Sequence, residues 1–294
     1  MGMKHHYSLR KIAAALSCIF IASVTFAGTS LTANAAATSI TRISGNTRYE
    51  TMGMVSRAAF LSAPPSKAAV VASGTDFPDA LAASSLAGHL NAPILLTDPK
   101  SLSNETANEL NRLDANAIFV IGGNKAVSHN VENEIRATHP SATITRLAGS
   151  TRFDTAHSIY NELATLGAKP QTAIISTGFN FADALSISPY SYMQSAPFFL
   201  SSQSGLDEAS LNTLRNFQTA IIVGGEQAVP TSVEQQLKSI GVSTVRIQGT
   251  TRYETSLEIG KFTLNNLSLD PSSVVYALEP ISRTHFRKRP CWYQ

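Results

Sequence analysis

The chain has 294 residues, of which 43% are hydrophobic and 15% charged, so it has ample apolar material for buried cores and does not have the composition of a disordered protein. Its formal net charge is +3, but without the basic end segments 1–11 and 278–294 it has 16 Lys+Arg against 19 Asp+Glu, a net charge of about −3. This excludes a generally basic surface for nucleic acid. The two cysteines, Cys18 and Cys291, lie near the chain ends, so no disulfide or thiolate metal site is predicted between them.

Residues 1–37 have the pattern of a secretory signal peptide: a basic start, an apolar run over 12–26 and small residues before cleavage near Ala35 or Ala37. A retained transmembrane anchor is the alternative, but the run of about 15 apolar residues is shorter than the ~20 that span a bilayer. A lipoprotein signal ending at Cys18 fits less well, because cleavage there would divide the apolar run. We therefore expect a secreted chain that has no membrane contact after cleavage.

One ten-residue pattern, R-hydrophobic-x-G-x-T-R-aromatic-acid-T, occurs three times. The copies begin 104 and then 100 residues apart, a spacing that fits a small domain rather than a solenoid repeat. The sequence predicts a tandem array with a shortened last copy. The expected units are repeat 1 (38–141), repeat 2 (142–241) and a partial repeat 3 (242–277), with the pattern at 42–51, 146–155 and 246–255.

Within repeat 1, short apolar runs alternate with helical patterns. Four- or five-residue runs rich in β-branched residues, each followed by a helix, predict βαβ crossovers and a parallel sheet covered on both faces. The expected fold class is therefore α/β, as tandem parallel-sheet repeats. The expected strands are 40–43, 68–72, 93–97 and 118–121, the expected helices are 48–61, 78–90, 105–113 and 131–137, and repeat 2 has matching strands at 173–176, 197–200 and 220–223.

Glycine or capping residues follow the strands of each repeat. Loops after parallel strands share the carboxyl edge of the sheet, where ligands bind, and each leads into a helix N-terminus whose N–H groups attract anions. We therefore expect an anion site formed by Arg48, the Gly122–Gly123 backbone and the helix that begins near Asp76. The corresponding candidates in the later copies are Arg152, Arg252, Gly224 and Gly225.

The same motifs also have a structural interpretation. Residues 47–50 form a T-x-x-E capping box, matched at 151–154 and 251–254, and Asp76 with Pro78 has the pattern of an N-cap followed by an early proline. Because losing such a cap costs about 1 kcal/mol, stability alone is a reason for the motif to recur.

Capping does not require the arginine of the motif. Arg48 and Arg152 therefore have two alternative roles, ligand binding or a salt bridge to Asp79 or Asp183.

No motif of enzyme chemistry is found. The sequence has no Gly-rich nucleotide loop, no G-x-S-x-G nucleophile elbow and no H-E-x-x-H zinc motif. Asp79 and Asp183 recur, but neither has a partner acid nearby in the sequence, and the histidines do not recur. We predict neither catalysis nor a cofactor nor a metal.

The tail, 278–294, departs from the repeat. Residues 274–277 should lead into a copy of G-T-D-F-P-D-A-L (74–81), but 278–286 is basic and has no regular pattern. One allowed set of codons for 278–286, read from its third base, encodes Gly-Thr-Asn-Phe-Pro-Asp-Ala-Phe. We therefore predict a frameshift near Ala277 that produced this tail.

Four motifs in order, the R-x-x-G-x-x-R-Y-E-T start and residues 74–81, 92–96 and 120–123, resemble the type 2 cell-wall-binding repeat of Gram-positive bacteria, over roughly 39–277. The resemblance implies a Rossmann-like or toprim-like α/β fold in each repeat, and usually three repeats in a pseudo-threefold unit. It also implies noncovalent attachment of exported proteins to an anionic wall polymer, such as a teichoic-acid-like polymer or a secondary wall polysaccharide. The family positions present here are Arg48, Arg152, Arg252 and the segments 93–96 and 197–200.

The chain also departs from the family pattern. Repeat 2 has Phe179 and Ala182 where repeat 1 has Thr75 and Pro78, and the third copy ends its match at Ala277. We predict an exported wall-binding module at the cell surface whose repeats pack against each other. Two alternatives stay open: an N-acetylmuramoyl-L-alanine amidase-type wall hydrolase without its catalytic domain, and an adhesin or S-layer-type surface protein.

Overall fold

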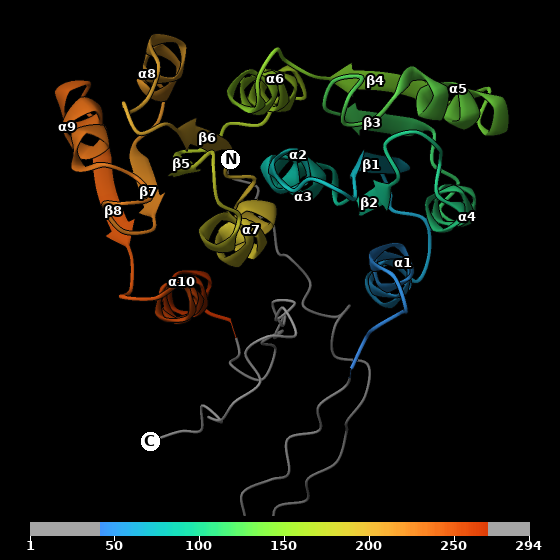
Figure 1. Cartoon of the computed structure of the whole chain (residues 1–294), viewed down its shortest axis with the longest axis horizontal. Coiled ribbons are helices and arrows are strands. Elements are labelled where there is room, and N and C mark those ends of the chain that lie inside the picture. The colour runs from blue at the N-terminus through green and yellow to red at the C-terminus, as the bar shows by residue number, and fades with distance from the viewer. Residues whose placement is uncertain (1–41, 270–294) are drawn as a thin grey trace, which may run out of the picture.

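The computed structural model describes residues 42–269, which form two four-stranded sheets with helices around them (Figure 1). Every neighbouring pair of strands is parallel, and the two sheets have the same order, β2-β1-β3-β4 and β6-β5-β7-β8. This confirms the predicted α/β fold of tandem parallel-sheet repeats. The strands are β1 (Ala68–Ser73), β2 (Ile94–Thr97), β3 (Ala117–Ile121), β4 (Thr143–Leu147), β5 (Thr172–Thr177), β6 (Phe198–Ser201), β7 (Thr219–Val223) and β8 (Ser243–Ile247).

The helices follow the expected order with one difference. The helix expected over 78–90 is divided at Ala83, whose ψ of −6° departs from the α-helical value of about −42°. The helices are α1 (Arg48–Ala59), α2 (Pro78–Ala82), α3 (Ser84–Leu90), α4 (Asn104–Arg112), α5 (His129–Thr138), α6 (Arg152–Thr165), α7 (Ala182–Gln194), α8 (Glu208–Leu214), α9 (Thr231–Ser239) and α10 (Arg252–Leu267).

The strand that precedes each motif helix belongs to the sheet before it. β4 pairs with β3 and β8 pairs with β7, so the residues just before α6 and α10 complete the sheets of the preceding units. Residues 42–43, expected as part of a strand, are not in one. The physical reason is that the part of the chain described by the structure offers no earlier sheet for them to join.

The first sheet is covered on both faces, as predicted. Alternate residues of a strand point to opposite faces. Val70 of β1 packs in the cluster that contains Leu86 of α3, whereas Val71 packs with Leu110 of α4 and Ile135 of α5. All six residues of β1 are buried, which explains why its sequence is a continuous apolar run.

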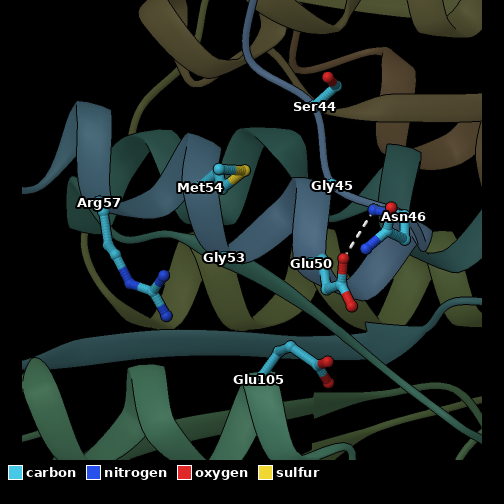
Figure 2. Close-up of a pocket in the computed structure, with 8 residues that line it drawn as sticks. All are labelled: Ser44, Gly45, Asn46, Glu50, Gly53, Met54, Arg57 and Glu105. Carbon is cyan, nitrogen blue, oxygen red and sulfur yellow. Dashed lines mark hydrogen bonds between the residues drawn. The ribbon is translucent and has the colours of Figure 1, made fainter.

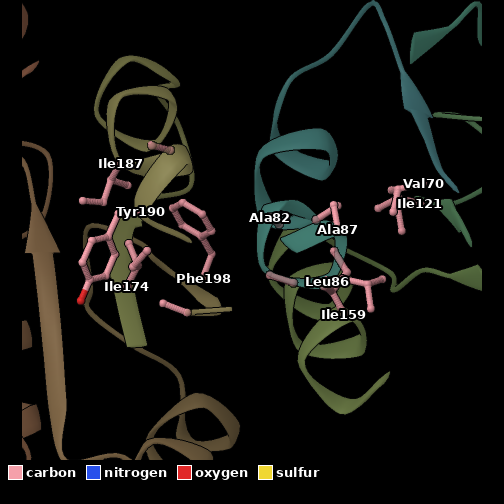
Figure 3. Close-up of a cluster of buried hydrophobic side chains, with 14 of the residues drawn as sticks. Val70, Ala82, Leu86, Ala87, Ile121, Ile159, Ile174, Ile187, Tyr190 and Phe198 are labelled. Atoms are coloured by element: carbon pink, nitrogen blue, oxygen red, sulfur yellow. The ribbon is translucent and has the colours of Figure 1, made fainter. Parts of the chain in front are cut away.

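A single hydrophobic core joins the two repeats. Figure 3 shows Leu86 and Ile159 with Ile174, Ile187 and Phe198, which belong to one buried cluster. α3 and α7 come so close that Gly88 leaves no room for a side chain beside the backbone of Tyr192, whose hydroxyl donates to the Ala92 carbonyl at 3.2 Å. The repeats therefore pack against each other, as expected.

α10 extends this arrangement. It lies against α7, and the rings of Phe262 and Tyr190 are 5.5 Å apart (Figure 1). The predictions for the signal peptide, for the strand near Val274 and for the tail fall on residues 1–41 and 270–294, outside the described part of the chain.

Candidate functional site

The repeated motif forms the helix starts predicted for it. Thr47 caps α1, its hydroxyl accepting the Glu50 N–H at 3.1 Å. In the second copy, Thr151 caps α6, and the Asp154 carboxylate accepts a hydrogen bond from the Thr151 N–H at 3.0 Å. A glutamate at the same place is one methylene longer, and Glu50 reaches one residue further back, to the N–H of Asn46 at 2.6 Å; the third copy does the same.

The first arginine of the motif, at the end of the last strand of each sheet, binds an acid on the helix that precedes that strand. Arg146 donates to the Gly122 carbonyl at 2.7 Å and, through Nε and Nη2, to Glu132 at 3.0 and 2.8 Å. Arg246 makes the same pair of contacts in the second sheet, with Gly224 and Glu234. This role was not predicted from the sequence, because the two acids lie on α5 and α9 and only the fold brings them to the motif.

The second arginine of the motif is the predicted ligand-binding residue. Arg48 Nη1 donates to the Gly74 carbonyl, and Arg152 Nη1 donates to the Gly178 carbonyl at 2.6 Å. Each guanidinium therefore lies over the loop after the first strand of its own sheet.

The arginines of the second and third copies also face an acid of the preceding repeat. Burial raises the pKa of Asp79 and of Asp183, and the nearby charge of Arg152 and of Arg252, respectively, acts in the opposite direction. This supports the electrostatic alternative to ligand binding at these two positions. Arg48 belongs to the first copy, and within residues 42–269 it forms no ion pair with a carboxylate.

The glycine cradle expected at Gly122 is filled by the protein itself. Gly122 has a φ of +94°, its N–H donates to the Leu147 carbonyl at 2.8 Å, and Asp79 Oδ2 occupies the space where a side chain would be. Gly224 is equivalent, with a φ of +101° and Asp183 beside it. The Gly122 N–H is therefore bonded within the protein, and the hydrogen bond of Arg48 goes to Gly74 instead.

The other predicted residues also have structural contacts of their own. The carbonyls of Gly123 and Gly225 accept hydrogen bonds, at 3.0 Å, from the backbone N–H groups of Val127 and Val229 in the turns that follow. The predicted Asp76 cap is wrong, since the N-cap of α2 is the next residue and no side chain caps that helix. The family segments 93–96 and 197–200 overlap the edge strands β2 and β6. β6 is buried throughout, and β2 is buried at alternate positions.

Two carboxyls at the repeat junction have perturbed acidity. Burial raises the pKa of Asp79, the neighbouring Asp76 raises it further, and Arg152 lowers it. Burial also raises the pKa of Asp183, against the opposing charge of Arg252. Asp79 and Asp183 are thus held as internal partners of the next copy's arginine.

The described part of the chain has neither a metal cluster nor a membrane-spanning helix. Among residues 42–269, no group of three or more His, Cys, Asp or Glu side chains is placed to hold a metal ion. No helix in that range is long and apolar enough to cross a bilayer.

The class of protein defined by these features is a tandem α/β repeat in which the motif arginines of the second and third copies lie at the junctions between units. The profile of the family "Cell wall binding domain 2 (CWB2)" matches residues 42–132 and 146–234, more than half of the chain. The chain therefore belongs to this family and is a cell-wall-binding module with two matched copies, which confirms the resemblance seen in the sequence.

Two similar proteins of Bacillus subtilis (strain 168) are wall-related by name. The chain is 30% identical to N-acetylmuramoyl-L-alanine amidase LytC over 90% of its own length and 50% of that protein. It is 32% identical to the "Amidase enhancer" over 75% of its length and 29% of that protein. The chain thus spans half or less of the curated relatives it matches here.

Solved structures support the same assignment. Cwp6 from Clostridium difficile superposes with a TM-score of 0.70 and 26% identity, over 76% of this chain and 35% of that one. Cwp8 from the same organism gives a TM-score of 0.67 and 30% identity, over 74% and 36%.

Proposed function

We propose that this module attaches noncovalently to an anionic polymer of the cell wall after export. The observation that carries the proposal is the pair of CWB2 copies that share one core, since a tandem arrangement presents equivalent surfaces to successive groups of a polymer. The mature region has a net charge of about −3, so attraction to a polyanion must come from locally placed cations rather than from the whole surface.

The cations we assign to this role are Arg48, Arg152 and Arg252. Arg48 is the strongest candidate: it is exposed, it lies in the first turn of α1, and its hydrogen bond goes to a backbone carbonyl rather than to an acid. Arg152 already interacts electrostatically with Asp79, so a polymer anion that binds Arg152 competes with this internal carboxylate. A single exposed contact is weak, but repeated contacts along one polymer gain ~10²–10⁴ through avidity.

The proposal includes no catalytic step and no cofactor. The family is that of a wall-binding domain, and the enzymes among the relatives extend well beyond the matched region. We further propose that the residues before 38 direct secretion, and that the two functional units follow the expected repeats, 38–141 and 142–241, with each boundary moved past the strand that completes the sheet before it, β4 or β8.

A second candidate is that the module serves a wall amidase. It is favoured by one observation, the match over half of LytC. The purified chain should release no peptides from cell walls under either candidate, so the test fuses it to an amidase catalytic domain: a module that serves an amidase should speed peptide release, and an unchanged rate would remove this candidate.

The arginine variants test the assignment of the site. Arg48→Ala should weaken wall binding about two- to fivefold per contact, the range for exposed ion pairs, and should cost less stability than Arg152→Ala, because it loses a carbonyl contact but no acid. Arg152→Ala should lower both binding and stability, because Arg152 also bridges to Asp79 and Gly178. Unchanged binding in the Arg48 variant, measured by sedimentation with isolated walls, would remove Arg48 from the site.

A further inference from the structure

A cleft on repeat 1 has a chemistry different from that of the motif arginines. α1, the loop before it and α4 enclose a space of about 450 Å³, within the range of small-molecule sites (Figure 2). Three charged side chains line it: Glu50 and Arg57 of α1, and Glu105 of α4. Gly53 lies between them, and its lack of a side chain keeps the space open.

The positively charged residue of the cleft, Arg57, is held in place by a buried carboxylate. Glu109 is fully buried, and its carboxylate binds Arg57 Nε at 2.9 Å and Arg112 Nη2 at 2.7 Å. Two guanidinium groups on one carboxylate leave a positive charge unbalanced within the trio. Arg57 Nη2 lies 3.7 Å from where a methyl on Gly53 would be, so this nitrogen borders the cleft.

The two acids lie at the other end of the cleft (Figure 2). One oxygen of Glu50 accepts the Asn46 N–H, which fixes the carboxylate at the start of α1. Glu105 forms no ion pair with another side chain of residues 42–269 and is only partly exposed. The cleft therefore has one fixed positive end and one negative end.

Repeat 2 shows that the fold does not require this arrangement. At the equivalent place, His157 and Tyr160 pack on Phe199, with ring centres 6.4 and 5.5 Å from it, and aromatic packing replaces the ion trio. A buried carboxylate with two arginines adds little stability over apolar packing, so its presence in one repeat needs another explanation. The equivalents of Gly53, Arg57, Glu105 and Glu109 are His157, Asn161, Ala209 and Thr213.

We propose that this cleft binds a short zwitterionic peptide, with the ammonium group of the peptide between Glu50 and Glu105 and its carboxylate on Arg57. An ammonium offers three donors to two carboxylates, and a guanidinium matches a carboxylate with paired N–H groups. Two acids at its rim disfavour a polyanion, so this site is separate from the proposed polymer contact and does not depend on it. The ligand is a short peptide with a free amino and a free carboxyl end, either soluble or part of the wall.

The test uses the full chain and the dipeptide alanyl-alanine, followed by NMR at the amides of α1 and α4. The free dipeptide should bind saturably, and blocking either end, by N-acetylation or C-amidation, should weaken binding at least about two- to fivefold. Glu105→Gln should weaken it similarly, whereas Glu208→Gln, the same change at the start of α8, should not. No saturable shift, or binding indifferent to both blocked ends, would overturn the proposal.

Gly53→His is the second variant, because it places the residue of repeat 2 in the cleft. It should abolish dipeptide binding while the chain stays folded and still sediments with polymer-bearing walls. Retention of dipeptide binding by this variant would contradict the assignment of the site. If the chain binds polymer-free peptidoglycan and Gly53→His removes that binding, the ligand is a peptide of the wall. If the chain binds the dipeptide but not polymer-free peptidoglycan, the ligand is a soluble peptide.

Discussion

The carboxylate of Asp79 packs against Gly122: its Oδ2 atom lies 2.3 Å from where a β-carbon at position 122 would be. The same relationship holds between Asp183 and Gly224 in the second sheet. The glycine loop after the third strand of each sheet therefore receives an internal anion, and the arginine of the next motif faces that anion from the neighbouring unit.

Gly122→Ala should destabilise the chain by about 1–3 kcal/mol or more, since the methyl group meets Asp79 and the φ of +94° is strained for alanine. Gly123→Ala is the matched control: a methyl group there has nothing within 4 Å, and we expect a change within about 0.5 kcal/mol. Urea unfolding of the two variants measures both values. Equal stabilities would show that Asp79 does not fill this space.

Asp79 should make the chain less stable as the pH rises. Its pKa is raised above 3.8 in the folded state, so between 3.8 and the raised value the folded chain holds more protons than the unfolded chain, and the free energy of unfolding falls with increasing pH. Asp79→Asn removes this dependence and should gain stability relative to the wild type across that window. Thermal melts between about pH 3.5 and 7 test the sign; a difference that does not change with pH would refute it.

Glu109 should show the opposite dependence. Burial, the largest influence, acts to raise its pKa, but the hydrogen bonds from Arg112, the nearby Ser56 hydroxyl and the charges of Arg112 and Arg57 together lower it below 4.5. Its contribution is therefore present above pH 4.5 and lost as the pH falls through the lowered value.

Glu109→Gln should cost about 1–3 kcal/mol at neutral pH, because two arginines lose the charged acceptor of their hydrogen bonds while their own side chains stay 52% and 28% exposed. Thr213→Ala, at the equivalent place in repeat 2, should cost under about 1 kcal/mol, since Thr213 bonds only to a carbonyl of its own helix. Denaturant unfolding of both variants makes the comparison. A loss for Glu109→Gln no larger than that for Thr213→Ala would show that the ion trio does not stabilise repeat 1.

The strands and motif helices were predictable because they are local. The apolar runs of β1 and β5 and the capping threonines Thr47 and Thr151 carry their signals in a few adjacent residues. The break at Ala83 was missed, since no residue there marks it, and the Asp76 cap failed because the helix begins two residues later, at Pro78.

The site was less predictable because its contacts cross between units. That Arg152 faces Asp79 and that Arg146 binds Glu132 depends on β4 joining the first sheet, a pairing that no local pattern indicates. The cleft beside Gly53 likewise required the packing of α1 on α4. The sequence did offer one signal for it, the glycine and charges in repeat 1 where repeat 2 has His157 and uncharged residues.

Gly88→Ala should disturb the junction of the repeats, since a methyl group there would overlap the backbone carbonyl of Tyr192. Overpacking of this kind costs about 1–3 kcal/mol. Gly260→Ala in α10 is the control, with nothing within 4 Å, and should gain about 0.5–1 kcal/mol from helix propensity. Thermal unfolding measures both, and a neutral Gly88 variant would contradict the close packing of α3 and α7.

The most direct test of the central claim is sedimentation of the purified chain with isolated Gram-positive cell walls, before and after acid removal of their anionic polymers. The account predicts saturable binding to native walls that weakens with added salt, because exposed charge contacts are screened over ~8 Å at physiological ionic strength. It also predicts that stripping the polymers removes most of the binding. Equal affinity for native and stripped walls, independent of salt, would contradict attachment through an anionic polymer.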